Sequence, residues 1–247
     1  MLTQLISKSA AVALIAMPLL ATAAPSSEPI SQFGILGTYN RFNLKGAGLS
    51  ETDSLPEGGL FYNFGNKMTA GPGLIYQAGI DLKSGKDKDD RLKDFQGDVD
   101  IGWRMALGDR DFLDVIGGGG YGRTRYTSHI DRYEISLLGR SPFLKAAMGY
   151  THHFDSASVR LEAGVRRTTE SDLKLKVNGM DIATADLKDR TNPYAEANFL
   201  FNTQGALSIA AGVYYSQTGY QLNTNNDLAR KVQLQRDELG AKVGIAF

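Results

Sequence analysis

Apolar and polar residues alternate along long stretches of this chain. Between residues 95 and 107, one set of alternate positions reads Phe, Gly, Val, Ile, Trp, Met, Leu, and the other reads Gln, Asp, Asp, Gly, Arg, Ala. Similar alternation occurs at 74–83 and at 238–247. A period of two places successive side chains on opposite faces of an extended strand. The pattern therefore predicts strands of roughly ten residues with one apolar face and one charged, glycine-rich face.

The alternation divides the chain into about ten strands, which we place at 31–44, 59–66, 73–83, 94–107, 112–123, 141–154, 159–168, 193–201, 206–217 and 231–247. Their connections differ in length. The short ones lie at 108–111, 155–158 and 202–205, and the long polar ones at 45–58, 84–93, 123–140, 168–192 and 218–230. Short turns at one end and long loops at the other are typical of transmembrane β-barrels.

The predicted fold class is therefore all-β: a closed, antiparallel, up-and-down transmembrane β-barrel. An alternative for the segment 123–140 is that it extends its hairpin well beyond the membrane. Eight strands remain the alternative for the whole barrel if one hairpin is wrongly assigned. A soluble β-sandwich would bury the apolar faces as its core. It explains neither the length of the strands nor the unequal connections.

The first residues follow a different pattern. Lys8 precedes an apolar stretch at 10–21, which ends in the small residues Ala21, Thr22 and Ala23. A basic start, a short apolar core and an A-x-A site indicate a cleaved secretory signal peptide. We therefore expect a signal peptide at 1–23, a short N-terminal segment at 24–30 and the barrel at 31–247. No other stretch has the ~18 apolar residues that a membrane helix needs.

If the apolar faces meet lipid, bulky aromatic side chains fall near the short-turn ends of six strands. These residues are Phe33, Phe64, Trp103, Phe154, Phe201 and Phe247. Such aromatic belts lie at the membrane–water interface. We expect a girdle of rings at this end of the barrel.

The last seven residues, AKVGIAF, resemble the C-terminal signal of Gram-negative outer-membrane β-barrels, with alternate apolar positions and a terminal phenylalanine. The resemblance implies a place in the outer membrane of a Gram-negative bacterium. It also implies that the barrel-assembly machinery recognises the last strand. The size and strand count are similar to small OmpA/OmpX-type barrels and to the ten-stranded omptin proteases.

The charges of the chain balance, with 27 Lys and Arg against 27 Asp and Glu, so nothing favours nucleic acid as a partner. No cysteine is present, so no disulfide contributes. The inward-facing positions carry both signs of charge: Asp81, Lys83, Asp98, Asp100, Arg104, Arg160, Glu162, Arg166, Glu196, Glu238 and Lys242. Buried charges persist only when paired, so we expect an ion-pair network that fills the narrow lumen. A narrow ion-conducting path, as in a small porin, is the alternative reading of the same residues.

A glycine run at 115–122, VIGGGGYG, has the G-x-G-x-x-G spacing of a dinucleotide-binding loop. That motif needs a helix start after the glycines, whereas here they lead into RTRYTS, which has neither a cap nor a helical period. In a small barrel, glycines on the lumen face leave room for long side chains from other strands. We assign this role to Gly118, Gly120 and Gly122, and we expect no cofactor.

The histidines do not form a catalytic pattern. The omptin resemblance would require an acid two residues before His129, but position 127 is threonine. His152 and His153, near Ser156, suggest the pair of a lipid A deacylase, but they lie at the short-turn end, away from the outer leaflet. Adjacent strand residues also point to opposite faces, which disfavours a shared metal. We predict no catalytic or metal site, and an outer-leaflet hydrolase is the third reading of the chain.

Two of the long connections carry further signals. Around Asn178 and Gly179, the segment 168–192 predicts a small ribbon of strands at 172–177 and 180–186. The segment 84–93, SGKDKDDRLK, is dense with charges of both signs, and its lysines and arginine lie near the outer leaflet. It could contact lipopolysaccharide phosphates or simply be a solvated loop. The sequence thus predicts a monomeric, non-enzymatic barrel that supports envelope integrity or surface interactions, with outer-membrane lipid and lipopolysaccharide as partners.

Overall fold

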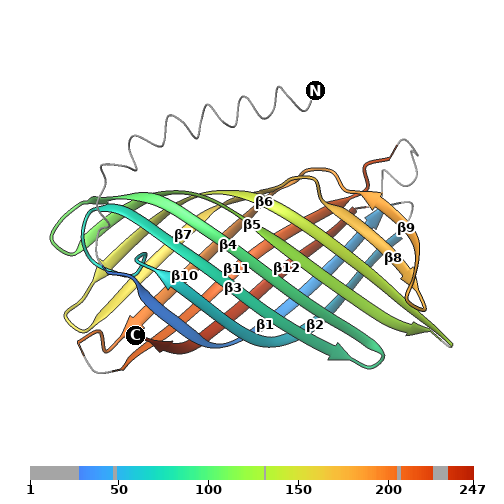
Figure 1. The fold of residues 1–247 in the computed structure, drawn as a ribbon, viewed down its shortest axis with the longest axis horizontal. Helices are drawn as coiled ribbons and strands as arrows, with labels where there is room; N and C mark the ends of the chain where they lie inside the picture. The colour runs from blue at the N-terminus through green and yellow to red at the C-terminus, as the bar shows by residue number, and fades with distance from the viewer. Residues whose placement is uncertain (1–27, 47–48, 131, 205–206, 225–232) are drawn as a thin grey trace.

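The described residues of the chain form twelve β-strands, of which ten close into an antiparallel barrel (Figure 1). The computed structural model describes residues 28–247 except 47–48, 131, 205–206 and 225–232. The strands are β1 Ile30–Gly46, β2 Leu49–Gly65, β3 Gly73–Asp87, β4 Asp90–Ala106, β5 Asp111–Ile130, β6 Tyr133–His153, β7 Ala157–Thr168, β8 Asp172–Val177, β9 Met180–Asp186, β10 Thr191–Phe201, β11 Ser208–Gln221 and β12 Gln233–Ala246.

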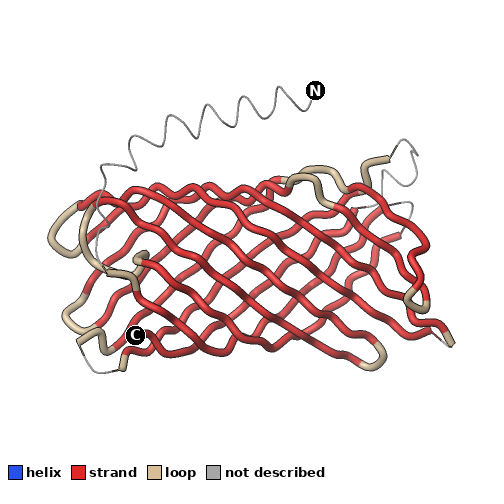
Figure 2. Tube along the Cα trace, in the orientation of Figure 1, coloured by secondary structure: helices blue, strands red, loops and turns tan. Residues whose placement is uncertain are grey.

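The barrel closes because every strand of the wall has two neighbours. Each strand pairs with the next in the wall, β7 pairs with β10, and β1 pairs with β12. Strands dominate the described residues, and only turns and short loops join them (Figure 2). The prediction of a closed barrel with ten strands is therefore confirmed, and the eight-strand alternative is wrong.

The N-terminal segments fall largely outside the described residues. The expected signal peptide at 1–23 lies wholly among the residues that are not described, and β1 begins at Ile30. No helix long and apolar enough to cross a membrane is found in the described part of the chain.

The two ends of the barrel differ, as the connections predicted. We call them the short-turn end, where Phe247 lies, and the long-hairpin end. At the long-hairpin end, the prediction of loops at 45–58 and 84–93 is wrong, because most of these residues continue the strands. Ser84 pairs with Lys93, for example, and only residues 88 and 89 separate β3 from β4. The segment 123–140 extends its hairpin, as the alternative for that segment predicted. Beyond the membrane the outer face meets water, so the apolar alternation ends although backbone pairing continues.

The predicted ribbon is present as β8 and β9, with the expected boundaries. Asn178 and Gly179 form its turn with φ values of 50° and 80°, the conformation that two-residue hairpin turns require. β8 pairs with β6 beyond the end of β7, so the ribbon extends the barrel wall at the long-hairpin end (right in Figure 1). A bridge between Leu187 and Leu222 joins this extension to the end of β11.

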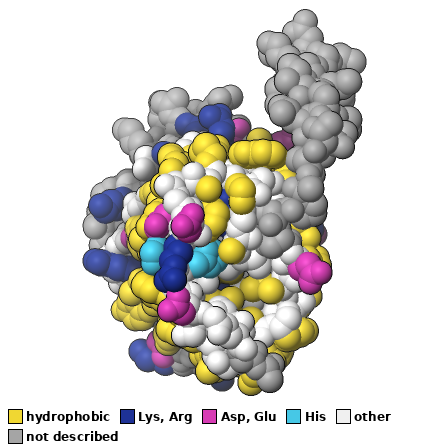
Figure 3. Space-filling view, turned by 90° about the vertical axis from the view of Figure 1, so that its left-hand side faces the viewer, with side chains coloured by type: hydrophobic (Ala, Val, Ile, Leu, Met, Phe, Trp, Pro, Cys, Tyr) yellow, Lys and Arg dark blue, Asp and Glu magenta, His cyan; other side chains and the backbone are white. Residues whose placement is uncertain are grey.

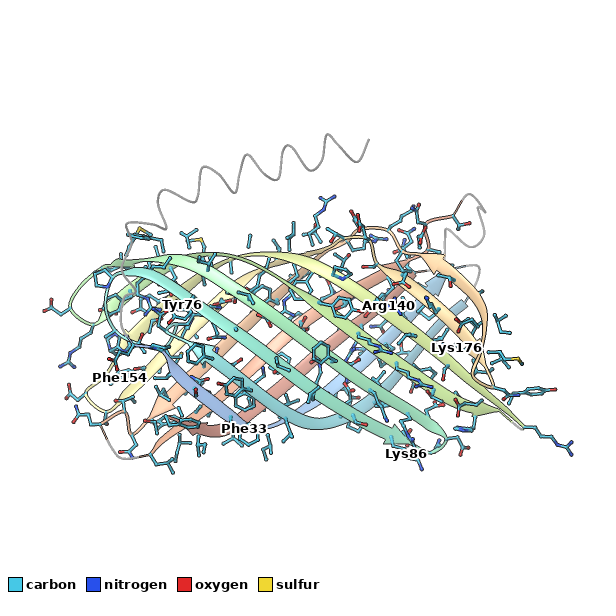
Figure 4. The ribbon with its side chains drawn as sticks, viewed as in Figure 1. Phe33, Tyr76, Lys86, Arg140, Phe154 and Lys176 are labelled. Atoms are coloured by element: carbon cyan, nitrogen blue, oxygen red, sulfur yellow. The ribbon has the colours of Figure 1, made fainter. Side chains whose placement is uncertain are left out.

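The barrel is apolar outside and polar inside. Val99 and Trp103 on the outer face of β4 are 62% and 48% exposed, whereas Asp100 and Arg104 on its inner face are fully buried. The aromatic residues expected to form a girdle all have exposed side chains: Phe33, Phe64, Trp103, Phe154, Phe201 and Phe247. Figure 4 shows Phe33 and Phe154 in the half of the barrel nearer the short-turn end. The outer face is thus suited to lipid, while the lumen contains the charged groups.

The outward orientation of β3 and β4 can be tested by labelling. Cysteines that replace Ile80 and Ile101 should resist a water-soluble maleimide in intact cells, because lipid covers these exposed side chains. Cysteines at Lys88 and Asn178, in hairpin turns, should react readily. Equal labelling at all four positions would contradict a membrane-embedded wall.

Candidate functional site

The half of the lumen nearer the short-turn end contains a dense group of charged side chains. We call it the inner cluster, and it consists of Lys67, Asp100, Arg104, Asp114, Lys145, Arg160 and Glu162. Two lysines bridge the same two acids. The Nζ atom of Lys67 lies 2.5 Å from Asp100 and 3.1 Å from Glu162, and that of Lys145 lies 2.6 Å and 3.2 Å from the same residues. Each acid therefore has more than one cation beside it.

Two arginines complete the inner cluster around Asp114. Arg104 donates from Nε and Nη2 to the two carboxylate oxygens, over 2.7 Å and 2.8 Å. Arg160 also donates to Asp114, and its other terminal nitrogen lies 3.0 Å from Glu162. Both guanidinium groups are almost completely buried. Buried charges of this kind are stable only when they are paired. The pairing is incomplete at two atoms, because Arg160 Nε and Asp100 Oδ1 are buried without a hydrogen-bond partner among the described residues.

The connection between β2 and β3, at 66–72, closes the lumen at the short-turn end. Arg104 donates hydrogen bonds to the carbonyl oxygen of Lys67, over 2.6 Å, and to that of Thr69. These bonds hold the turn against the inner cluster, where the Lys67 side chain is 2% exposed. Met68 is buried beside Leu200. The connection at 66–72 therefore fills the lumen at this end of the barrel.

A second group of charges crosses the lumen toward the long-hairpin end. This outer cluster consists of Glu57, Lys83, Asp94, Arg236 and Glu238. Arg236 lies 3.0 Å from both Glu57 and Glu238 and also contacts Asp94. Lys83 lies 2.5 Å from Glu238, so this group too is held by shared partners.

Between the two clusters lies a thinner middle layer. Lys242 donates to both carboxylate oxygens of Asp81, over 2.8 Å and 3.0 Å. Arg166 donates to the Gln96 side chain over 3.4 Å, and its guanidinium lies over the Tyr194 and Phe143 rings. A cavity of about 50 Å³ lies on the inner-cluster side of this layer, and one of about 100 Å³ lies on the outer-cluster side.

Nine of the eleven lumen residues expected from the sequence fall into these groups, and Asp98 and Glu196 do not. The pairs that form include Asp81–Lys242, Lys83–Glu238 and Arg160–Glu162. Asp98 is 4.0 Å from Lys145. Glu196 lines both cavities and has no ion pair with any described residue.

Six charged residues of the two clusters were missed by the sequence reasoning: Glu57, Lys67, Asp94, Asp114, Lys145 and Arg236. Four of them lie at inward-facing positions of predicted strands, so the alternation contained the signal that would have found them. Glu57 and Lys67 lie in segments outside the predicted strands, where the pattern assigns no face. No signal in the sequence places those two in the lumen.

Glycines on the inner face make room for the inner cluster. A Cβ at Gly118 would overlap the Asp100 carboxylate and lie 2.6 Å from the Val99 carbonyl oxygen. A Cβ at Gly120 would lie 2.5 Å from the Phe143 ring, and one at Gly149 would overlap the Arg160 guanidinium. Gly122 has no atom closer than 3.6 Å. The glycine run is thus a steric requirement of the packed lumen at Gly118 and Gly120.

The histidines are held in separate contacts. At the short-turn end, which Figure 3 views directly, His152 Nδ1 lies 2.7 Å from Asp111 and His153 Nδ1 lies 2.7 Å from Ser158 Oγ. At the other end, His129 Nε2 lies 3.5 Å from Glu134. No group of three His, Asp or Glu side chains suited to a metal occurs among the described residues.

Comparisons with known proteins agree with this architecture. A family model for the outer membrane protein beta-barrel domain matches residues 10–247. The chain belongs to this outer-membrane β-barrel family. Short turns of such barrels face the periplasm, so we assign the short-turn end to the periplasmic side and the long-hairpin end to the cell surface.

Several solved outer-membrane barrels are similar to the chain. The protease OmpT of Escherichia coli matches with a TM-score of 0.56 and 8% identity, over 92% of this chain and 98% of that one. The translocator domain of the autotransporter NalP from Neisseria meningitidis matches with a TM-score of 0.42 and 9% identity, over 96% of both chains. No curated protein sequence matches the chain. The similarity to OmpT concerns the fold alone.

The steric role of the glycine run gives a matched pair of variants. Gly118→Ala should lower the free energy of unfolding of this outer-membrane barrel by about 1–3 kcal/mol, the usual effect of overpacking. Gly117→Ala, one residue away on the lipid face, should have little effect because a Cβ there would meet no atom within 4 Å. Urea titration of the refolded protein measures both. A larger loss for Gly117→Ala would contradict the assignment of faces.

The inner cluster gives a second test, in which a buried ion pair is compared with an exposed one. Arg160→Ala should lower the free energy of unfolding by a few kcal/mol, toward the lower end of the ~3–5 kcal/mol for breaking a buried pair. The loss is moderated because Asp114 keeps Arg104. Arg110→Ala removes an exposed ion pair of 2.7 Å with Asp155 and should cost at most about 1 kcal/mol. Equal losses would show that the inner cluster contributes no more than a surface pair.

Proposed function

We propose that this outer-membrane barrel is a closed, non-enzymatic protein that supports envelope integrity or surface interactions through its long hairpins. The observation that supports this proposal is the filling of the lumen by two ion-pair clusters and the turn at 66–72. A closed lumen leaves the outer surface and the hairpins as the parts of the molecule that are available to partners.

The packing of the lumen disfavours the alternative of a narrow pore. A hydrated ion would have to pass both clusters, in which Arg104, Arg160 and Asp100 are almost completely buried and hydrogen bonded. The two cavities, of about 50 Å³ and 100 Å³, have room for a few water molecules each. Separating the paired charges to open a path would cost several kcal/mol.

An outer-leaflet hydrolase receives less support. Although OmpT shares the fold, residue 127 of this chain is threonine rather than the acid that the omptin pattern requires. Thr127 Oγ1 lies 2.9 Å from the Ser136 hydroxyl, so both form a structural contact between β5 and β6. His153 and Ser158 are in contact, but they lie at the periplasmic end. We therefore propose no catalytic role for these groups.

Planar-bilayer recording tests the proposal directly. Refolded wild-type protein should show no steady conductance, because the inner and outer clusters block the lumen. The triple variant Lys67→Ser, Arg104→Ser, Arg160→Ser removes three long side chains from the inner cluster and should increase the frequency of open events. Heat-modifiable migration on a gel provides the check that each sample is folded.

Steady, ion-selective conductance of the folded wild-type protein would overturn the closed-barrel proposal and favour a small porin. If the triple variant fails to fold, the wild-type recording still decides between the two functions.

A further inference from the structure

A group of basic side chains lies on the outer face of the wall at the long-hairpin end. We call it the basic surface, and it consists of Lys86, Lys88, Arg91, Lys93, Arg125 and His129. Five of these residues come from β3, β4 and β5, and Lys88 lies in the turn between β3 and β4. Together with Asp89, Thr127 and Glu134, they line a cavity of about 350 Å³. Figure 4 shows Lys86 near the end of the barrel that is farthest from Phe154. The site therefore combines two hairpins that are separate in the sequence.

The strand register places like charges directly opposite one another in this surface. Lys86 lies opposite Arg91 on β3 and β4, and Lys93 lies opposite Arg125 on β4 and β5. Opposite residues of an antiparallel pair share a face, with Cβ atoms about 5 Å apart, and like charges there are destabilising. Folding alone gives no reason for two such pairs side by side. A bound anion would remove the repulsion.

The carboxylates nearby do not neutralise the basic surface. Glu134 lies 3.5 Å from His129 and 3.9 Å from Arg125, at the far end of the cavity. Lys86, Arg91 and Lys93 have no carboxylate within ion-pair distance among the described residues. All three side chains are exposed. The cavity thus contains five lysines and arginines against the two acids Asp89 and Glu134.

The position of the basic surface along the barrel indicates where its ligand would be found. Lys93 lies two residues beyond Phe95 on the same face of β4, and Arg125 lies four residues beyond Tyr121 on β5. Both aromatic side chains are 37% exposed on the outer wall. At ~3.3 Å per residue, Lys93 and Arg125 lie roughly 7–13 Å along the tilted strands beyond these rings. Exposed aromatic rings are typical of the membrane–water interface, so the two cations lie on its headgroup side.

We propose that the basic surface binds the phosphate groups of an outer-leaflet lipid headgroup, with Arg91, Lys93 and Arg125 as its central ligands. Arginine presents a planar fork of donors that matches phosphate oxygens, and lysine adds a mobile positive charge. A phosphate between the like-charge pairs would accept from both β4 and β5. The proposal does not depend on whether the lumen is closed.

Native mass spectrometry of the refolded full chain in neutral detergent measures the bound lipid directly. The probes are lipid A with two phosphate groups and the same lipid A after removal of its phosphates. Wild-type protein should bind the phosphorylated probe more tightly than the other, which keeps only the acyl-chain contacts; equal binding of the two probes would overturn the proposal. Arg91→Gln with Lys93→Gln should weaken this binding by roughly tenfold or more, the scale for losing charge-assisted hydrogen bonds.

A control variant at the same end of the barrel removes the same charge. Lys174→Gln with Lys176→Gln changes the ribbon, where Lys176 donates a hydrogen bond to Asp181 and so lowers the pKa of that carboxyl group. This variant should bind phosphorylated lipid A as the wild type does. If both variants weakened lipid binding equally, the effect would come from the net charge of the protein and not from a specific site. This result would overturn the proposed site.

Two competition measurements show whether the bound anion is a lipid headgroup, free phosphate or a surface glycan. Inorganic phosphate at the concentration of the lipid should not displace it, because the lipid is also held by its acyl chains at the wall. Full displacement would overturn the lipid assignment in favour of free phosphate. Stronger binding of a sulfated polysaccharide than of phosphorylated lipid A would overturn it in favour of a surface glycan.

Thermal unfolding without lipid provides a readout that does not depend on binding. Arg91→Gln with Lys93→Gln should unfold at the same temperature as the wild type or higher, because it relieves the repulsion between opposite strands. Phosphorylated lipid A should then raise the midpoint of the wild type more than that of the variant. A clearly lower midpoint without lipid would show that these side chains stabilise the fold and would overturn the argument from repulsion.

Discussion

Every backbone polar group of a chain that crosses lipid must find its hydrogen-bond partner within the protein, and this constraint determines the rest of the structure. A sheet meets it only by closing, which here requires β1 to pair with β12. The pairing extends to the last residue, because Phe247 and Ser31 exchange backbone hydrogen bonds of 2.8 Å and 2.9 Å. Closure with ten strands leaves a lumen too narrow for charged side chains to remain hydrated separately.

The narrow lumen explains why charges and glycines occur together on the inner face. A lysine or arginine can be accommodated only if nearby strands leave room for its side chain. Gly149 on β6 leaves such room for Arg160 on the neighbouring strand β7. The charged group is stable there only with carboxylates within reach. Few acidic residues are needed because each carboxylate pairs with more than one cation. Asp114 forms ion pairs with Arg104 and Arg160, and Glu162 forms ion pairs with Lys67 and Lys145. The core of this protein is therefore a network of ion pairs, and its apolar surface faces lipid.

The sequence predicts the parts of this structure that depend on alternation. The two faces of β4 follow from local alternation, because lipid selects apolar residues and the lumen selects polar ones. The ribbon around Asn178 follows from the residue types that a two-residue hairpin turn requires. The outward length of β2 and β3 does not follow, since beyond the membrane neither face is required to be apolar. Lys67 could not be placed either, because it lies outside any strand and its position depends on contacts with Asp100 and Glu162, distant in the sequence.

The same residue types have different roles on the two sides of the wall. Inside, each cation of the inner cluster lies within about 3 Å of a carboxylate, and the requirements of folding account for its position. Outside, Lys93 faces Arg125 across two strands, an arrangement that opposes folding. Selection for stability would replace either residue with a neutral or acidic one. A bound phosphate between Lys93 and Arg125 would offset this repulsion, which supports the lipid-binding site that we propose on the outer wall.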